Sequence, residues 1–100
     1  TVPEPAPREE LRVLVFPNPV RDVHTAVFCV RGVIVERMRV EIYDLSGRLV
    51  WEGEALGNEL LWHTEDLSRL PLANGVYLYR VVVEAEEKRE VVQGKVVILR

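Results

Sequence analysis

A chain of 100 residues with a hydrophobic fraction of 48% is long enough for one domain with one core, and too apolar to be wholly disordered. Its 13 basic and 16 acidic residues are interspersed and leave a net charge of -3, so we expect neither nucleic acid nor anionic lipid as a partner. Its apolar runs fall short of the roughly 18 residues of a membrane-spanning helix, which predicts a soluble, globular protein without a membrane span.

The first ten residues are predicted to form a linker. Pro3, Pro5 and Pro7 alternate with small or charged residues, which favours an extended, solvated backbone with nothing to bury. We therefore divide the chain into a Pro-rich linker at 1–10 and a folded domain at 11–100. The linker places any larger domain on its N-terminal side, and the lack of a signal peptide or an initiating Met predicts a fragment or a processed form of a longer protein.

After residue 10 the pattern changes to short β-prone runs separated by turn residues. No stretch keeps a helical period long enough to predict a helix. The predicted strands are 12–16, 24–31, 37–44, 48–54, 59–64, 75–85 and 91–99. Seven strands in about ninety residues favour an all-β fold, an immunoglobulin-like β-sandwich of about seven antiparallel strands.

The first turn signal, Pro17-Asn18-Pro19, follows the first predicted strand. Two prolines remove two backbone donors and fix two φ angles, so a strand cannot continue through them. The asparagine side chain can hydrogen-bond to backbone across the turn. The motif is therefore predicted to be a strand-ending corner.

The strand predicted at 37–44 has the clearest alternation of apolar and polar residues. Its apolar face is Met38, Val40 and Ile42, and its other face is charged apart from Tyr43. A turn should follow at Asp44, because an Asp side chain bonds the backbone ahead of it and Gly47 accepts a positive φ. This turn predicts a hairpin with the strand at 48–54.

The pair Asn74-Gly75 is the second strong turn, because both residues accept left-handed backbone angles at low cost. It begins the longest predicted strand, at 75–85. The inner face should be Tyr77, Tyr79, Val81 and Val83, since the opposite face carries Arg80 and Glu84, which are costly to bury. That opposite face would leave an outer apolar patch of Val76, Leu78 and Val82 unless another segment covers it, and such patches often mark contact sites.

The last hairpin is the least clearly patterned. The charged run at 84–90 is predicted to be its solvated tip. The final strand, 91–99, lacks clean alternation, which predicts burial on both faces or a bulge near Gly94. The pattern does not identify the inner face of this strand.

Residue types that support catalysis or bind metals are scarce and scattered. His24 and His63 fall in different predicted strands, with no third ligand at the spacing of a metal site. Ser46 and Ser68 fall in predicted turns without a nucleophile-elbow pattern. The single cysteine, Cys29, lies in an apolar run and is predicted to be buried and inert. We therefore predict no enzyme activity, no cofactor and no metal.

Four motifs, in this order, resemble the type A C-terminal sorting domains of the type IX secretion system, also called the Por secretion system. They are Phe16-Pro17-Asn18-Pro19, Tyr43-Asp44-Leu45-Ser46-Gly47-Arg48, Leu72-Ala73-Asn74-Gly75-Val76-Tyr77 and Lys95-Val96-Val97-Ile98-Leu99-Arg100. Each motif alone is weakly specific, but the ordered set covers nearly all of the predicted folded part. The resemblance implies a non-catalytic sorting domain that targets an N-terminal cargo protein across the outer membrane through the type IX translocon.

The family pattern also implies roles for particular residues. Gly75 and Tyr77 match its Gly-x-Tyr motif, and Lys95 and Arg100 match its terminal basic pair, so the resemblance implies that the translocon recognises these four residues. A purely structural role remains open for Gly75 and Tyr77, whereas Lys95 and Arg100 have less structural reason to be basic. The remaining motif residues are predicted to be structural: Pro17, Asn18, Pro19, Asp44, Gly47 and Asn74.

The resemblance further implies partners and a location. The cargo lies N-terminal in the same chain and crosses the inner membrane by a separate signal peptide. The translocon then recognises the C-terminal domain, and a surface protease often removes it. We expect a monomeric domain, and a protein that is secreted or held at the outer-membrane surface of a Gram-negative bacterium after periplasmic transit. Truncating the last several residues should leave the cargo in the periplasm.

Two alternatives come from other classes of protein. Immunoglobulin-like domains related to that of the flagellar hook-capping protein share most of these motifs but usually add Trp-Asp-Gly, whereas Trp62 is followed here by His63-Thr64. A glycan-binding accessory domain of a cell-surface enzyme would use an exposed Trp51 or Tyr43 as a stacking platform. Buried tryptophans would argue against that second alternative.

Overall fold

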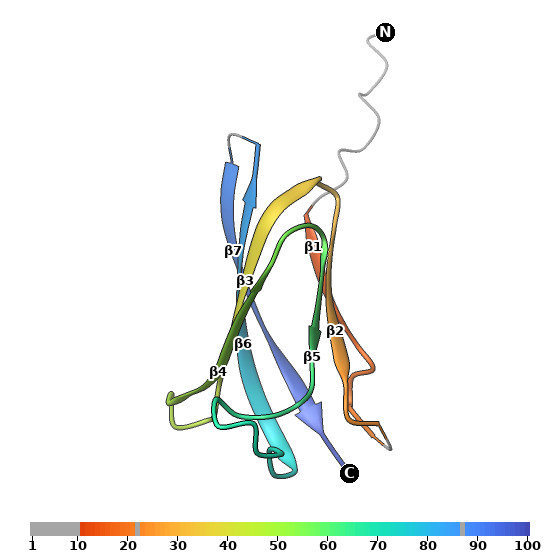
Figure 1. Cartoon of the computed structure of the whole chain (residues 1–100), viewed down its shortest axis with the longest axis vertical. Helices are drawn as coiled ribbons and strands as arrows, with labels where there is room; N and C mark the ends of the chain where they lie inside the picture. The colour runs from red at the N-terminus through yellow and green to blue at the C-terminus, as the bar shows by residue number, and fades with distance from the viewer. Residues whose placement is uncertain (1–10, 22, 87) are drawn as a thin grey trace, which may run out of the picture.

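The computed structural model describes residues 11–21, 23–86 and 88–100, so the linker predicted at 1–10 lies outside the described residues. Within them the secondary structure consists of β-strands joined by turns and loops (Figure 1). The strands are β1 (Arg12–Phe16), β2 (Ala26–Arg31), β3 (Val35–Tyr43), β4 (Leu49–Ala55), β5 (Glu59–Trp62), β6 (Gly75–Ala85) and β7 (Lys88–Ile98). The predicted all-β class with seven strands is confirmed.

The strand boundaries follow the turn residues of the sequence closely. The predicted bounds of β1 and β6 match the observed ones, and β7 shows the largest difference, because it begins at Lys88 where residue 91 was predicted. The charged run was wrongly predicted to be all tip: Ala85 pairs with Lys88, and the charged residues at 88–90 continue the strand ladder. Alternating charged residues are compatible with a strand that extends into solvent.

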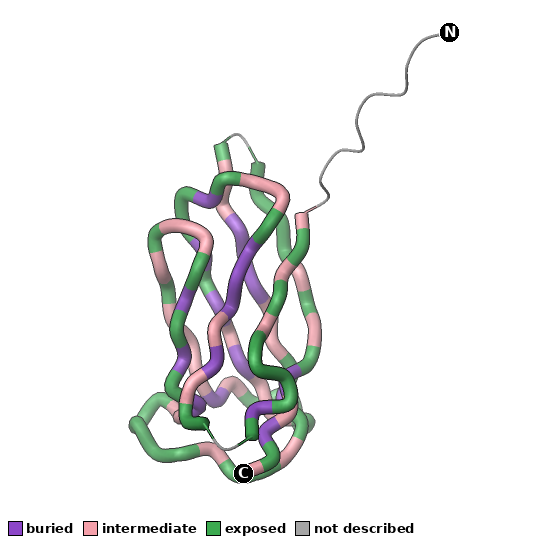
Figure 2. The backbone as a smooth tube through the Cα atoms, turned by 90° about the vertical axis from the view of Figure 1, so that its right-hand side faces the viewer, coloured by how far each residue is buried: buried purple, intermediate pink, exposed green. Residues whose placement is uncertain are grey.

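The strands form two antiparallel sheets that pack as a sandwich. One sheet has the order β1-β2-β5 and the other has the order β4-β3-β6-β7. Figure 1 shows the hairpin of β6 and β7 extending at one end, while the chain terminates at Arg100 at the opposite end. Figure 2 shows buried segments along the body of the sandwich and exposed residues at the hairpin end.

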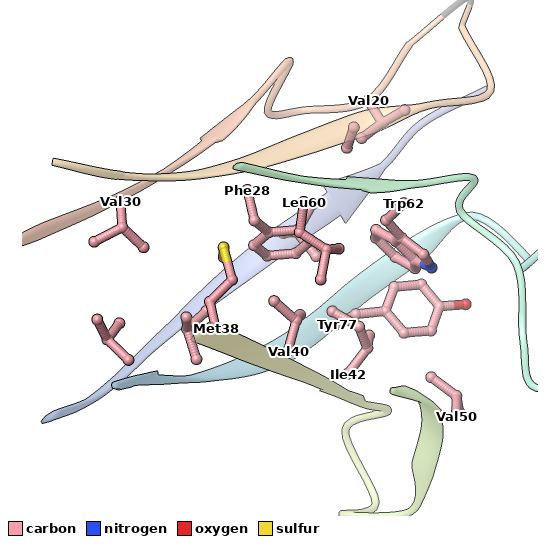
Figure 3. Packing of buried hydrophobic residues seen from close by; sticks show 14 of the residues in the cluster. Val20, Phe28, Val30, Met38, Val40, Ile42, Val50, Leu60, Trp62 and Tyr77 are labelled. Carbon is pink, nitrogen blue, oxygen red and sulfur yellow. The ribbon is translucent and has the colours of Figure 1, made fainter. Parts of the chain in front are cut away.

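The core lies between the two sheets and is built from the predicted apolar faces. Met38, Val40 and Ile42 have 0% exposure, as the alternation of their strand predicted. Figure 3 shows these side chains facing Phe28 and Trp62 of the other sheet. The face of β6 with both tyrosines is the inner one, as predicted: its members Tyr77, Val81 and Val83 are buried, and Tyr79 is half-buried. The thiol of Cys29 is also buried, as expected.

Two glycines in the larger sheet are required by aromatic rings that lie against them. A Cβ atom on Gly94 would collide with the ring of Tyr79, its cross-strand partner on β6. A Cβ atom on Gly53 would lie within 2.8 Å of Cζ2 of Trp51. The bulge predicted near Gly94 was wrong, since the pairing of β6 with β7 passes through Gly94 without a register shift. Glycine stands there because another side chain approaches closely.

The turn at Asp44 is stabilised by one carboxylate oxygen. Asp44 Oδ1 accepts hydrogen bonds from the Ser46 amide at 2.9 Å, the Ser46 hydroxyl at 2.5 Å and the Arg48 amide at 3.0 Å. The bond from the Ser46 hydroxyl, followed by that from the Arg48 amide, lowers the pKa of Asp44. Gly47 completes the turn at a φ of 90°. The predicted roles of Asp44 and Gly47 in a hairpin turn are confirmed.

A second turn, at Asp66, repeats the backbone pattern of the turn at Asp44. Asp66 Oδ1 accepts from the Ser68 amide at 2.8 Å and from the Leu70 amide at 2.9 Å. Asp66 and Leu70 also form the backbone bond that Asp44 and Arg48 form in the first turn. The position of Gly47 is taken by Arg69, which adopts a φ of 65°. A non-glycine residue therefore occupies a backbone conformation that favours glycine.

Replacing Arg69 with glycine is expected to stabilise the domain. A non-glycine residue in the left-handed region costs more free energy than glycine loses through its greater freedom in the unfolded chain. The free energy of unfolding should therefore rise by about 0.5–1 kcal/mol. Thermal and urea unfolding measure the change. Ser68→Gly, one residue earlier and outside the left-handed region, is the control and should be neutral or destabilising. Equal unfolding free energies for the two variants would contradict this account.

Candidate functional site

The C-terminal half of β7 is held along its edge by the Pro17-Asn18-Pro19 corner. Asn18 Nδ2 donates to the Lys95 carbonyl at 3.0 Å, and the Val97 amide donates to Asn18 Oδ1 at 3.1 Å. Val20 extends this contact: its amide donates to the Val97 carbonyl at 2.7 Å, and its carbonyl accepts from the Leu99 amide at 2.8 Å. The predicted strand-ending corner is confirmed. Its partner, the terminal strand, was not predicted.

Asn74 holds the end of the same segment in a similar way. Its Nδ2 donates to the Arg100 carbonyl at 2.8 Å, and its Oδ1 accepts from the Arg100 amide at 2.9 Å. An asparagine therefore brackets the backbone at each end of residues 95–100. Asn18 acts at the first end and Asn74 at the second, so both predicted structural asparagines fix the course of the terminal segment.

The side chain of Arg100 is bound inside the fold. Its Nη1 donates to Thr64 Oγ1 at 2.7 Å, and its Nη2 donates to the Leu72 carbonyl at 2.6 Å. Charge-assisted bonds of this kind are the stronger class of protein hydrogen bond. The expectation that Arg100 has little structural reason to be basic was therefore wrong. Its guanidinium ties the terminal segment to the loop between β5 and β6.

Thr64 is the centre of this attachment. The residue has 0% exposure and a φ of 51°, which is rare for a β-branched side chain. Its hydroxyl lies 3.0 Å from the His24 carbonyl and 2.7 Å from the His63 carbonyl, either of which can accept its proton while the oxygen accepts from Arg100. The two histidines thus contribute backbone carbonyls here. Within residues 11–21, 23–86 and 88–100, no group of three or more His, Cys, Asp or Glu could hold a metal ion.

Gly75 and Tyr77 both have structural roles beside this segment. Gly75 pairs with Ile98 at the start of β6, with a φ of 156°. Tyr77 is 8% exposed and donates its hydroxyl proton to the Ala73 carbonyl at 2.7 Å. Burial raises the pKa of this phenol. The tyrosine thus fills the core and closes the loop that precedes β6.

Lys95 differs from the other basic residue of the predicted pair. It lies on the outer face of the larger sheet, opposite Leu78 of β6, and its side chain is exposed. The ion pairs found among the described residues do not include it. The structure therefore separates Lys95 and Arg100: the charge of Arg100 is used inside the fold, and that of Lys95 faces solvent.

The predicted outer apolar patch is smaller than expected. Val76 is 36% exposed and Leu78 is 41% exposed, as predicted, but Val82 is only 7% exposed. Val82 lines a hollow among long charged side chains that include Arg37, Arg39 and Arg89. Such side chains can cover apolar surface with their alkyl stems. On this face, exposed apolar surface therefore remains at Val76 and Leu78, near Lys95, and at Val91, which is 44% exposed opposite Val82.

Of the two aromatic residues proposed as a glycan platform, Trp51 is turned toward the core and Tyr43 lies on the outer face of the larger sheet. Trp62 has 0% exposure, and its ring centroid lies 5.9 Å from that of the half-buried Trp51. Tyr43 is half-buried as well. A buried tryptophan cannot stack on a sugar, and Trp51 packs against Trp62, so the structure argues against these tryptophans as a glycan platform. In the described part of the chain, no helix has the length and hydropathy to cross a membrane.

Comparison with known proteins finds one matching family model and several similar solved structures. A family model described as the secretion system C-terminal sorting domain matches residues 14–98. PorU of Porphyromonas gingivalis, solved as a latent dimer, is 29% identical with a TM-score of 0.68, over 89% of this chain and 9% of that protein. PorZ, an essential surface component of the type IX secretion system of the same organism, is 26% identical with a TM-score of 0.65, over 88% of this chain and 11% of that protein. No curated protein matches the chain.

This chain spans only about a tenth of the length of PorU and PorZ, with shares of 9% and 11%. An engineered protein with 18% identity and a TM-score of 0.61 shares the fold alone. The family match begins at β1 and ends with β7, and so includes the corner at Asn18, the Asp44 hairpin and the Gly-x-Tyr strand. The chain therefore belongs to the family of secretion-system C-terminal sorting domains, and its function is that of a sorting signal for secretion.

Proposed function

We propose that this domain directs a cargo protein, N-terminal to it in the same chain, through the type IX translocon, and that the translocon contacts the domain at Lys95. Family membership implies a secreted or cell-surface protein. The proposed export route has three steps. The protein crosses the periplasm of a Gram-negative bacterium, the domain passes the outer membrane as a monomer, and a surface protease then removes the domain.

The exposed position of Lys95 is the observation that supports the proposed contact with the translocon. Its backbone is fixed by Asn18, its side chain points to solvent, and its charge has no counter-ion among the described residues. A cation that a fold positions but does not use is available to a partner. The other predicted recognition residues, Gly75, Tyr77 and Arg100, are proposed to act by holding the terminal segment in place, because their contacts lie within the fold.

The test is export of a reporter carrying the domain. Residues 1–100 are fused behind a signal peptide and a reporter in a bacterium with the type IX system, and surface, medium and periplasmic fractions are assayed. The wild-type fusion should reach the surface or medium and should remain periplasmic in a translocon mutant. Lys95→Ala should accumulate in the periplasm, whereas Lys88→Ala, an exposed lysine on the same strand, should be exported normally.

Two results would contradict the proposal. Periplasmic retention of a folded wild-type fusion would remove the sorting role itself. Normal export of Lys95→Ala would leave that role intact but would place the contact elsewhere on the domain. Thermal unfolding of each variant shows that retention does not arise from loss of the fold.

A further inference from the structure

The outer face of the larger sheet is built from rows of residues that pair across its strands. Tyr43 of β3, Leu78 of β6 and Lys95 of β7 form one row, and Glu41, Arg80 and Gln93 form the next. Because side chains alternate along a strand, the members of both rows point to the same face. These two rows therefore place apolar and charged side chains next to each other at the Lys95 end.

A hollow of about 360 Å³ lies over these two rows. Its lining includes Tyr43, Leu78, Arg80 and Gln93, together with Gly47 of the hairpin turn and Gly94 of β7. Gly47 has no side chain to fill the hollow, whereas Gly94 lines it with backbone only, because a Cβ there would point to the inner face, toward Tyr79. The volume lies at the lower end of the range of about 300–1,000 Å³ typical of ligand sites, so the hollow suits a single large side chain and little more.

Some charged side chains around the hollow are paired within the domain, and others are not. Glu41 is only 13% exposed and accepts a hydrogen bond from Arg80 at 3.2 Å. Asp44, next to Tyr43, uses one carboxylate oxygen for the bonds of its own turn. Arg48, next to Gly47, is 78% exposed, and its Nε lies 3.6 Å from Asp44 Oδ2. By contrast, Lys95, which follows Gly94 of the lining, is exposed and has no counter-ion among the described residues. The unpaired charge beside the hollow is therefore positive, and it complements a carboxylate.

Farther along the same face, Arg39 is paired with acidic side chains. Arg39 donates to Glu52 at 2.7 Å, and it also lies 3.8 Å from Glu41. Val82, in the row beyond Arg80, is 7% exposed. Val91, the partner of Val82 on β7, is 44% exposed, but the hollow in that region is lined by Val82 and otherwise by charged side chains. A hollow lined by Tyr43 and Leu78 is the feature that distinguishes the Lys95 end.

We propose that this hollow is a docking surface for the secretion machinery, which inserts an aromatic side chain over Leu78 and places a neighbouring carboxylate against Lys95. This inference rests on the proposed function and names the chemistry of its partner. The aromatic group fits the shape and the apolar walls, and the acidic group matches the charge of the rim. Removal of apolar surface from water supplies affinity, and the ion pair fixes orientation.

Export of the reporter fusion tests the apolar half of the surface. Leu78→Glu places a repelling charge in the hollow and should reduce the exported fraction by about tenfold or more, as expected for a central interface position. The matched control is Val91→Glu, a residue of similar exposure (44% against 41%) on the same face but beyond the hollow, which should be exported normally.

The charged half is tested by two substitutions of one residue. Lys95→Glu should reduce export as strongly as Leu78→Glu, while Lys95→Arg should retain most of it, because only the sign of the charge is preserved in the second. If Leu78→Glu failed to fold, these two variants would still decide the question. A photo-crosslinking amino acid at position 78 should label a translocon component, and one at position 61, which is 53% exposed on the smaller sheet, should not.

The outcomes separate this inference from the proposed function. A wild-type fusion that is exported by the translocon, together with normal export of Leu78→Glu and Lys95→Glu, would overturn the docking surface and leave the sorting role standing. A wild-type fusion that stays in the periplasm would overturn both. Crosslinking from position 61 but not from position 78 would move the interface to the other sheet.

Discussion

Deleting residues 95–100 is expected to unfold the domain and not only to remove an address. The segment contains Val96 and Ile98, both with 0% exposure in the core. Loss of a buried Ile or Leu side chain alone costs about 2–5 kcal/mol, and a small domain is stable by only about 5–15 kcal/mol. The deletion also removes the hydrogen bonds to Asn18, Val20 and Asn74. Residues 75–78 of β6 would then lose their partners on β7.

Circular dichroism, thermal unfolding and resistance to proteolysis would measure the effect of this deletion. The truncated chain should show no cooperative transition, whereas Lys95→Ala should unfold within a few degrees of the wild type, because its side chain is exposed. Arg100→Ala should fall between them, since it loses two charge-assisted bonds but no core residue. A cooperative transition in the truncated chain near the wild-type temperature would refute this expectation.

The deletion result also decides how secretion experiments must be designed. Because truncation is expected to remove the fold, retention of a truncated cargo in the periplasm would not distinguish a lost recognition signal from a lost domain. Point substitutions at exposed residues make that distinction. Lys95 is suited to it because its backbone contributes to the fold through Asn18 while its side chain does not.

Replacing Trp62 with alanine should be the most destabilising single substitution described here. The side chain is fully buried, and its ring lies 6.1 Å from that of Phe28 and 5.9 Å from that of Trp51. Truncating a buried tryptophan costs about 3–5 kcal/mol. Its Nε1 also donates to the Glu65 carbonyl at 3.1 Å, so the substitution releases the start of the loop that holds Arg100.

Denaturant unfolding of Trp62→Ala and Trp62→Phe separates the two contributions. The phenylalanine variant keeps an aromatic ring in the core but lacks the donor to Glu65, so its loss should be smaller than that of the alanine variant. Near-equal losses would mean that the hydrogen bond, not the burial, dominates. A loss below about 1 kcal/mol for Trp62→Ala would contradict the packing shown in Figure 3.

Periodicity predicted the strands well where one face of a strand is buried and the other is wet. The strand of Met38, Val40 and Ile42 is the clearest case. Periodicity failed at β7, because the second half of this strand has apolar residues on both faces, and because Gly94 is required by the ring of Tyr79 and not by a bulge. The burial of Val82 was not predictable either, since it depends on charged residues of neighbouring strands.

The candidate site was predicted in part, because its motifs are local but its contacts are not. The residues of the corner at Asn18 and of the turn at Asn74 could be identified as turn formers, yet Asn18 bonds to Lys95, 77 residues away. Nothing in a single sequence indicates such a pairing. One signal was available and missed: Asp66-Leu67-Ser68 repeats Asp44-Leu45-Ser46, and the repeat predicts the second turn.

The bracketing of residues 95–100 by Asn18 and Asn74 has a consequence for the timing of folding. The bonds of Asn18 join residues 77 and 79 positions apart, and contacts of such long range form late because a long loop must first be closed. The sandwich can therefore close only after the chain is present through residue 100. A receptor that binds only the folded domain would therefore bind only chains that have been synthesised through residue 100.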